Sequence, residues 1–172
     1  LIMIAVGTPS KNGDINLEYI RSALKIISKY IKSVNYFVSV VIKSTVLPGT
    51  TDTFAKNIIE KYTNKVLGQF GLGMNPEFLR EGNALEDAEN PDRIVLGFCD
   101  GKTLNLLREL YKPWNTLKIE VNSRTAEMIK YTNNSILASQ ISLVNEIANI
   151  AQQIGAIDIS EVMKGVLSDK TV

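Results

Sequence analysis

Two glutamates in the stretch MNPEFLREG, residues 74–82, have the type and spacing for acid–base chemistry. Glu77 and Glu81 are four residues apart, and an Asn-Pro turn signal precedes them directly after a glycine-bearing strand pattern. A carboxylate in such a place can act as a general base, directly or through a water molecule. The same pair around Arg80 is equally typical of a solvent-exposed helix surface, so these residues alone leave both interpretations open.

Lys130 and Asn134 form a second candidate pair. They are four residues apart in a helical pattern, so both side chains project from one face of the helix, one turn apart. An ammonium group and an amide placed together can donate hydrogen bonds to an oxygen that develops negative charge. A solvent-exposed polar face is the alternative interpretation.

Hydroxyl groups follow two strand patterns directly. Thr45, with Ser44 before it, ends one apolar run, and Thr8 stands in the Gly-Thr-Pro sequence that ends another. Such hydroxyls can orient a water molecule or a cofactor amide, or simply cap the next helix. The single cysteine, Cys99, has no basic neighbour in GFCDG that would lower the pKa of its thiol, and we interpret it as structural.

Composition excludes several classes of protein. The 172 residues contain no histidine, so neither a Ser-His-Asp nor a Cys-His catalytic site can be assembled, and we expect no metal site. A formal net charge of +1 without a basic stripe argues against nucleic-acid binding. No apolar run approaches the ~18 residues of a membrane span. One cysteine fits a reducing compartment, and we expect a cytoplasmic protein.

The elements that must position these residues alternate along the chain. Buried strands are predicted at residues 1–6, 36–45, 70–74, 93–98 and 116–121, and helices at 16–32, 50–63 and 101–112, with a short helical or irregular segment at 83–90. This alternation is typical of an α/β fold with a parallel sheet, whose ligands bind at the carboxyl ends of the strands. We therefore expect Gly7-Thr8-Pro9, Ser44-Thr45 and Asn75-Pro76-Glu77 to meet at one edge.

The pattern changes near residue 121. Apolar residues recur at helical spacing from Ser123, a plausible N-cap, to about Gly155, and one more helix follows Asp158 at 159–166. A helix of this length would bridge domains or pack against a second subunit. Leu1 opens inside an apolar run and Val172 closely follows a helical pattern, so we expect the chain to be a piece of a longer protein.

Four ordered stretches carry a family resemblance: IAVGTPS (4–10), IKSTVLPGTT (42–51), NPEFLREGNALEDAENPDRIVLG (75–97) and AEMIKYTNNSILASQISLVNEIA (126–148). Together they resemble the UDP-glucose/GDP-mannose dehydrogenase family, and the UDP-glucose branch most. The resemblance implies that residues 1–120 are the later part of a Rossmann-like NAD-binding domain. Residues 121–172 would then begin a central helical domain whose long helix forms a homodimer or a larger oligomer.

The resemblance also implies an activity. Members of the family oxidise the C6 alcohol of a nucleotide sugar, here UDP-glucose, to a carboxylate, reducing two NAD through a thioester on a cysteine. Carried over by position, Thr8, Thr45 and Glu81 would contact NAD, and Thr45 would also orient the catalytic water. Glu77 would act as the base in thioester hydrolysis.

The substrate contacts follow in the same way. Lys130 and Asn134 would hold the C6 oxygen, with the lysine stabilising its negative charge. The sugar site would be lined by consecutive residues: Glu77, Phe78, Leu79, Arg80 and Glu81.

Two family features do not occur in this sequence, and they keep alternatives open. The G-x-G-x-x-G fingerprint is absent, and so is the cysteine segment, whose place Cys99 does not occupy, so this chain alone should be inactive. The alternatives are a non-catalytic α/β interaction module, a hydroxyacid dehydrogenase of the 6-phosphogluconate type, or a dehydrogenase of GDP-mannose or a UDP-N-acetylhexosamine.

Overall fold

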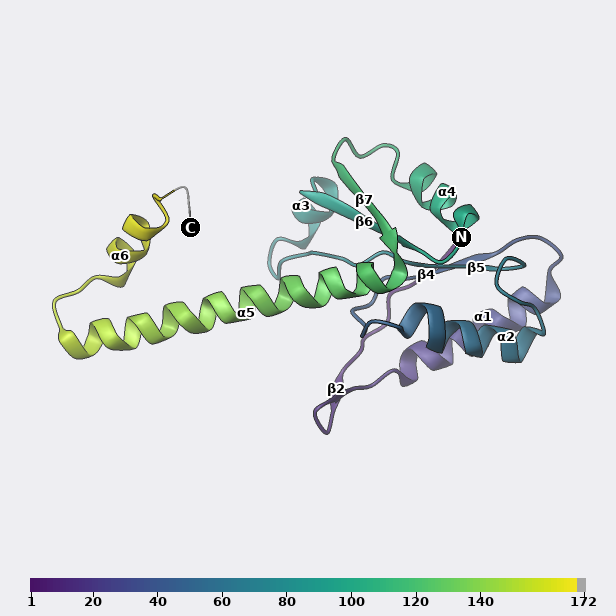
Figure 1. The fold of residues 1–172 in the computed structure, drawn as a ribbon, viewed down its shortest axis with the longest axis horizontal. Helices are drawn as coiled ribbons and strands as arrows, with labels where there is room; N and C mark the ends of the chain where they lie inside the picture. Colours follow the sequence, from purple (N-terminus) through teal and green to yellow (C-terminus); the bar gives the residue numbers. More distant parts are fainter. Residues whose placement is uncertain (170–172) are drawn as a thin grey trace. The chain divides into compact units, whose positions relative to one another are not determined.

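The computed structural model describes residues 1–169 and divides the chain into two compact units, Leu1–Tyr131 and the residues from Thr132 onward. The first unit contains a five-stranded sheet of order β1-β4-β5-β6-β7 (Figure 1), formed by β1 (Ile2–Ile4), β4 (Ser39–Ile42), β5 (Gly71–Met74), β6 (Arg93–Phe98) and β7 (Leu117–Asn122). The predicted α/β class is confirmed. One detail of the prediction is wrong, because β5 and β6 pair antiparallel whereas the other pairs are parallel.

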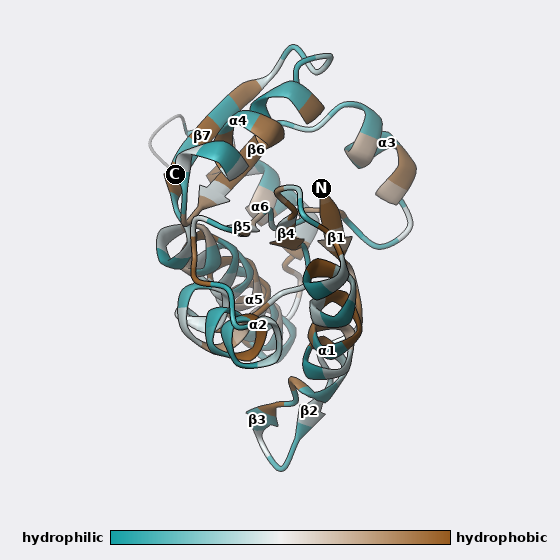
Figure 2. Ribbon diagram, turned by 90° about the vertical axis from the view of Figure 1, so that its right-hand side faces the viewer, coloured by the Kyte–Doolittle hydropathy of each residue, from teal (hydrophilic) through white to brown (hydrophobic). Residues whose placement is uncertain are grey.

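Helices cover both faces of this sheet. The helices α1 (Glu18–Ser33) and α2 (Lys56–Thr63) lie on one face, and α4 (Gly101–Leu110) lies on the other (Figure 1). In Figure 2, α1 carries both brown and teal along its length, as an amphipathic helix does. Each helix therefore buries one apolar stripe against the strands.

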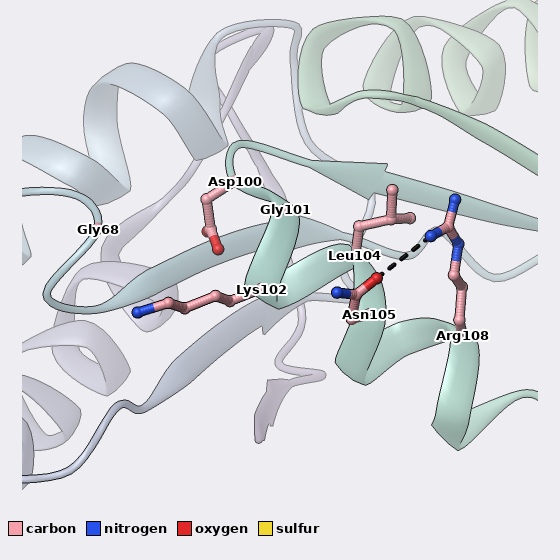
Figure 3. A pocket seen from close by; sticks show the side chains of 7 residues that line it. All are labelled: Gly68, Asp100, Gly101, Lys102, Leu104, Asn105 and Arg108. Atoms are coloured by element: carbon pink, nitrogen blue, oxygen red, sulfur yellow. Dashed lines mark hydrogen bonds between the residues drawn. The ribbon is translucent and has the colours of Figure 1, made fainter.

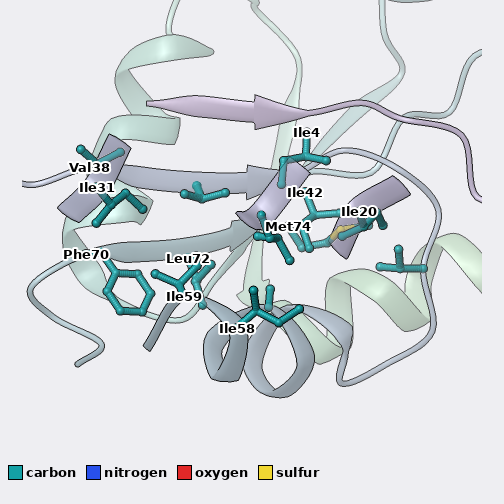
Figure 4. Close-up of a cluster of buried hydrophobic side chains, with 14 of the residues drawn as sticks. Ile4, Ile20, Ile31, Val38, Ile42, Ile58, Ile59, Phe70, Leu72 and Met74 are labelled. Atoms are coloured by element: carbon teal, nitrogen blue, oxygen red, sulfur yellow. The ribbon is translucent and has the colours of Figure 1, made fainter. Parts of the chain in front are cut away.

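The interior strand β4 contributes to two apolar clusters because its side chains alternate between the faces of the sheet. Val40 and Ile42 join the larger cluster with residues of α1, α2 and β5, part of which is shown in Figure 4. Val41 belongs to the smaller cluster, with Leu104 and Leu107 of α4. Burial of this strand on both faces explains why three apolar residues, Val40 to Ile42, follow one another without alternation.

Glycines in β5 and β6 let neighbouring elements approach closely. A Cβ on Gly73 would lie 2.9 Å from the carbonyl oxygen of Gly97 and 2.9 Å from Cγ2 of Thr103 in α4. A Cβ on Gly97 would lie 2.5 Å from Cβ of Ala126 and 2.7 Å from the carbonyl oxygen of Met74. Ala126 belongs to α5 (Ser123–Ile154), so Gly97 sets how closely the first turns of that helix pack on the sheet.

Gly97→Ala should therefore destabilise the protein. The added methyl group would overlap with a helix and a backbone carbonyl, and moving either would disturb the packed sheet. We therefore expect a loss of roughly 1–3 kcal/mol in the free energy of unfolding. Gly101→Ala is the matched control, because nothing lies within 4 Å of its added Cβ. Urea unfolding of both variants measures the difference, and equal stability of the two would contradict this reading of Gly97.

The structure contains a hairpin that sequence analysis missed. Strands β2 (Ser10–Lys11) and β3 (Asp14–Ile15) pair antiparallel around Asn12 and Gly13. Both turn residues have positive φ, 57° and 87°, which is the conformation that an Asn-Gly pair adopts in a two-residue hairpin turn. The Asn-Gly signal was present in the sequence, but the flanking strands of two residues each are too short to show alternation.

The helix predicted over residues 50–63 forms in two parts. It begins with a π-helical segment, η1 (Thr50–Ala55), in which the N–H of Phe54 donates to the carbonyl of Gly49, and continues as α2. Gly49 enters this segment with a φ of 95°, which favours glycine. The short segment after the glutamates is helical as α3 (Ala84–Glu89).

Helix α5 begins in the first unit and continues into the second, which also contains α6 (Ile159–Val166). The predicted cap of α6 is confirmed, because the Asp158 side chain accepts from the N–H groups of Ser160 and Glu161. The predicted cap of α5 is wrong: Ser123 is already helical, and the side chain of Asn122 accepts from the N–H of Thr125. Among the described residues, no helix is long and apolar enough to cross a membrane.

Candidate functional site

Three polar strand ends meet at one edge of the sheet, as the sequence predicted. The Thr8 hydroxyl, after β1, donates to the carbonyl of Thr45, after β4, at 2.9 Å. The Ser44 hydroxyl donates to the carbonyl of Val6 at 2.6 Å. The N–H of Asn75, after β5, donates to the carbonyl of Ile42 at 2.9 Å. The hydroxyl of Thr45 makes no hydrogen bond within residues 1–169, so it can bind a ligand or a water molecule.

Glu77 and Lys130 form an ion pair beside these strand ends. Nζ of Lys130 lies 3.2 Å from Oε1 of Glu77, and the side chains are 6% and 33% exposed, respectively. The other carboxylate oxygen of Glu77 accepts from the N–H of Leu79 at 2.6 Å. An ammonium group held this far from solvent interacts more strongly with a charge than one in water. The pair therefore combines a proton acceptor with a cation that can stabilise negative oxygen.

Phe78 lies between this pair and β6. Nζ of Lys130 is 5.2 Å from the centroid of the Phe78 ring, and Cζ of Arg93 is 4.3 Å from it. Two cations thus contact one aromatic ring, which fixes the ring and adds cation–π stabilisation. Leu79, the next residue, is 42% exposed and open to a ligand.

Arg80 and Glu81 are placed differently from Glu77. The Arg80 guanidinium binds Asp87 of α3, with Nη2 2.5 Å from Oδ1, and the backbone N–H of Arg80 donates to the same carboxylate. Hydrogen bonds from Arg80 hold the pKa of Asp87 well below its usual range. Glu81 is exposed and makes no hydrogen bond or ion pair within the described part of the chain. The two glutamates therefore do not share Arg80, and only Glu77 contacts Lys130.

Asn134 follows Lys130 on the same helix, and its side chain is exposed. It belongs to the second compact unit, whereas Lys130 belongs to the first. The role of Asn134 at the C6 oxygen stays a prediction.

Asn75 is the centre of a contact network that sequence analysis missed. It is 1% exposed, and its amide donates to the carbonyl of Val95 in β6 at 2.9 Å. Its Oδ1 accepts from Nζ of Lys43 at 3.1 Å and from the hydroxyl of Tyr111. The sequence identified Asn75 only as part of a turn. The available signal was Lys43, a cation placed directly after a strand that is buried on both faces.

Glu127 connects the first turns of α5 to the loop after Thr45. Its side chain is 0% exposed, and it accepts from the N–H of Gly49 at 2.6 Å, from the N–H of Thr51 at 2.8 Å and from the Thr51 hydroxyl at 2.7 Å. Burial raises the pKa of this carboxyl above its usual value, and the three hydrogen bonds oppose that shift. Glu127 thereby holds the helix of Lys130 against the loop of Thr45.

Cys99 lies at the other edge of the sheet, because it follows β6, which runs antiparallel to β5. Its Sγ donates to the Ser123 hydroxyl at 3.2 Å, and burial raises the pKa of the thiol to about 11. A thiol with so high a pKa is a poor nucleophile at neutral pH. The interpretation of Cys99 as structural is supported.

A shallow pocket also opens at that other edge, near the start of α4 (Figure 3). Its two basic side chains are already engaged: Arg108 pairs with Glu120, with Nη2 2.6 Å from Oε2, and Lys102 lies over the ring of Phe37 at 4.9 Å. This pocket is remote from Glu77 and Lys130 in the sheet topology, and it adds nothing to the candidate site.

Comparison with protein families gives two adjoining matches. Residues 1–115 match the UDP-glucose/GDP-mannose dehydrogenase family, NAD binding domain, and residues 124–172 match the central domain of the same family. The first match confirms NAD as the predicted cofactor.

Similar proteins come from both named branches. A UDP-glucose 6-dehydrogenase of Bacillus subtilis (strain 168) is 45% identical over 100% of this chain and 38% of its own length. A GDP-mannose 6-dehydrogenase of Pseudomonas putida (strain KT2440) is 41% identical over 99% of this chain and 39% of its own length.

Solved structures agree. A ternary complex of GDP-mannose dehydrogenase from Pseudomonas aeruginosa superposes with a TM-score of 0.95 at 41% identity, over 99% of this chain and 39% of that chain. A UDP-glucose dehydrogenase from Pyrobaculum islandicum superposes with a TM-score of 0.93 at 37% identity, over 99% of this chain and 39% of that chain. The chain thus spans about two fifths of the length of these relatives.

Proposed function

This chain belongs to the UDP-glucose/GDP-mannose dehydrogenase family, and we propose that it forms part of an enzyme that oxidises the C6 alcohol of UDP-glucose to a carboxylate with NAD. The family comprises NAD-dependent nucleotide-sugar dehydrogenases. The choice of UDP-glucose follows the sequence NPEFLREG and the relative with 45% identity.

The ion pair of Lys130 and Glu77 carries the proposal. When NAD is bound, it accepts the hydride removed in each of the two oxidation steps. Lys130 holds the C6 oxygen and stabilises the negative charge that develops on it as its proton passes to a water molecule. Because Lys130 is almost completely buried, water competes little with a substrate oxygen for its hydrogen bonds.

Glu77 serves the hydrolytic half of the reaction. Water attacks the carbonyl of a thioester on a cysteine outside this chain, and the C–S bond breaks. The sugar leaves as a carboxylate, and the cysteine regains its free thiol. Glu77 accepts the proton of that water, and Thr45, whose hydroxyl is not engaged, orients it. Phe78, Leu79 and Arg80 then line the sugar site from the same loop.

The residues present fit part of the NAD molecule. The Thr45 hydroxyl offers a hydrogen-bonding group at the sheet edge, where Thr8 fixes the Thr45 backbone, and the exposed Glu81 carboxylate offers a further acceptor. No G-x-G-x-x-G loop, which would cradle the pyrophosphate, occurs in these 172 residues. We therefore assign only the part of NAD near the reacting carbon to this chain.

The proposal includes the domain division and the oligomer. The NAD-binding part would end near residue 120, and the helical part from 121 would form a homodimer or a larger assembly. Support comes from large apolar side chains that α5 exposes, namely Ile136, Leu137, Ile141, Leu143, Ile150 and Ile154. The proposed compartment is the cytoplasm, which suits a chain with one free cysteine.

Substrate turnover tests the function. The protein expressed from the complete reading frame around this chain should reduce two NAD for each UDP-glucose consumed, with a higher kcat/KM than for GDP-mannose or UDP-N-acetylglucosamine. A preference for GDP-mannose would reassign the substrate. Turnover of 6-phosphogluconate alone, or of no substrate in the panel, would overturn the proposal.

A further inference from the structure

Lys43 is a second lysine close to the proposed site, and the proposed function assigns it no role. It directly follows β4, it is half-buried, and its Nζ donates to Oδ1 of Asn75 at 3.1 Å. No carboxylate within residues 1–169 forms a salt bridge with it. A lysine held in this way loses much of its hydration without gaining an ion pair, which is an unusual arrangement for a purely structural residue.

Asn75 transmits the position of Lys43 to Glu77. Its side chain bonds Lys43 after β4, Val95 in β6 and Tyr111 at the end of α4. Its Oδ1 accepts from Lys43 and Tyr111 while its Nδ2 donates to Val95, and these three bonds favour one orientation of the side chain. Only Pro76 separates Asn75 from Glu77, and the network therefore fixes where the chain leaves the sheet and where Glu77 begins.

Lys43 also interacts electrostatically with both members of the ion pair. Desolvation is the main reason that the pKa of Lys43 lies below its ordinary value; repulsion from Lys130 adds to that shift, and attraction to Glu77 opposes it. Lys43, Lys130 and Glu77 are therefore close enough to influence one another, and these three groups together carry one net positive charge.

We propose that Lys43 is a positioning residue of this dehydrogenase: it orients Glu77 through Asn75 and supplies the excess positive charge that favours an anionic substrate oxygen at Lys130. This inference rests on the proposed function. When the C6 oxygen loses its proton, its new negative charge neutralises the net positive charge of the two lysines and Glu77. Without Lys43, the carboxylate of Glu77 would fully compensate Lys130 before any substrate arrives.

Three variants of the full-length protein separate these effects. Lys43→Met removes the charge and the donor, Lys43→Arg keeps the charge, and Tyr111→Phe removes only the other donor to Asn75. We expect Lys43→Met to lower kcat by about tenfold to hundredfold, with the KM for NAD changed by less than about threefold. Lys43→Arg should have a higher kcat than Lys43→Met, and Tyr111→Phe should lower kcat less than Lys43→Met does.

A labelling experiment tests the coupling without any turnover. Amine labelling of Lys43 is followed against pH by mass spectrometry in the wild type, in Lys130→Met and in Glu77→Gln. Loss of the Lys130 charge should move the Lys43 midpoint to higher pH, and loss of the Glu77 charge should move it to lower pH.

The outcomes distinguish this inference from the proposed function. If the wild type oxidises no nucleotide sugar, the proposed function is lost, whereas the labelling shifts still report whether Lys43 is coupled to the ion pair. Unmoved midpoints in both variants overturn the inference, and so does a kcat of Lys43→Met equal to that of the wild type. If Lys43→Met and Tyr111→Phe lowered kcat equally, the charge of Lys43 would have no role, and the inference would also be overturned.

Discussion

Replacing Lys130 with methionine or alanine in the full-length protein is expected to lower kcat by roughly a hundredfold to a thousandfold. Lys130 is 5% exposed, and its Nζ is the charged donor beside Glu77, so its removal leaves the developing oxyanion without that charge. Stabilisation of the developing oxyanion is needed in the transition state and much less in the bound substrate. The loss should therefore appear in kcat more than in KM.

Initial rates of NADH formation and direct titration of NAD binding measure this effect. The dissociation constant of NAD should change by less than about threefold, because Lys130 is assigned to the sugar oxygen. Lys25→Ala, on an exposed position of α1, is the control for removing a lysine and should leave kcat unchanged. If Lys130→Met folds normally and oxidises the substrate at the wild-type rate, the proposed role of Lys130 is wrong.

Replacing Glu77 with glutamine should cause a covalent sugar–enzyme species to accumulate. Glutamine keeps the size and shape of the side chain, and its amide oxygen can still accept from the N–H of Leu79, whereas the contact of Oε1 with Lys130 is lost as an ion pair. The amide cannot accept the proton of the attacking water, so hydrolysis of the thioester slows while its formation continues. Intact-protein mass spectrometry after mixing with UDP-glucose and NAD should show the added sugar nucleotide.

Glu81→Gln is the matched comparison, because Glu81 is exposed and does not contact Lys130. We expect weaker NAD binding in this variant and no accumulation of the covalent species. Cys99→Ser should still form the species in a Glu77→Gln background, because the Cys99 thiol lies at the opposite edge of the sheet. Rapid hydrolysis in Glu77→Gln would transfer the role of base to another group.

Much of the first unit could be predicted from local patterns. Residues 93–98 form β6 within the predicted bounds, because a short apolar run rich in β-branched and aromatic residues favours a strand buried on both faces. The meeting of Thr8, Thr45 and Asn75 followed from the rule that parallel strands place their carboxyl ends at one edge. The interpretation of Cys99 as structural followed from the absence of a basic neighbour in GFCDG.

Other features depend on contacts between distant residues, which no local pattern contains. The antiparallel course of β6 is fixed by its pairing with β5, and either direction would bury the same apolar residues. The network of Lys43, Asn75 and Tyr111 joins residues up to 36 positions apart in pairwise contact. Sequence spacing could place Lys130 on a helix face, but the packing of α5 on Gly97 and the hydrogen bonds of Glu127 bring it to Glu77.

The carboxylate of Glu127 also determines the rotational phase of helix α5. Successive residues of an α-helix are turned by about 100°, so three hydrogen bonds to Gly49 and Thr51 permit only one rotation of the helix about its axis. Lys130 follows three positions later and faces Glu77 only in that phase. Insertion or deletion of one residue between Glu127 and Lys130 would turn the lysine about a quarter of a revolution away from the carboxylate. The spacing between these two residues is therefore as important to the site as either side chain.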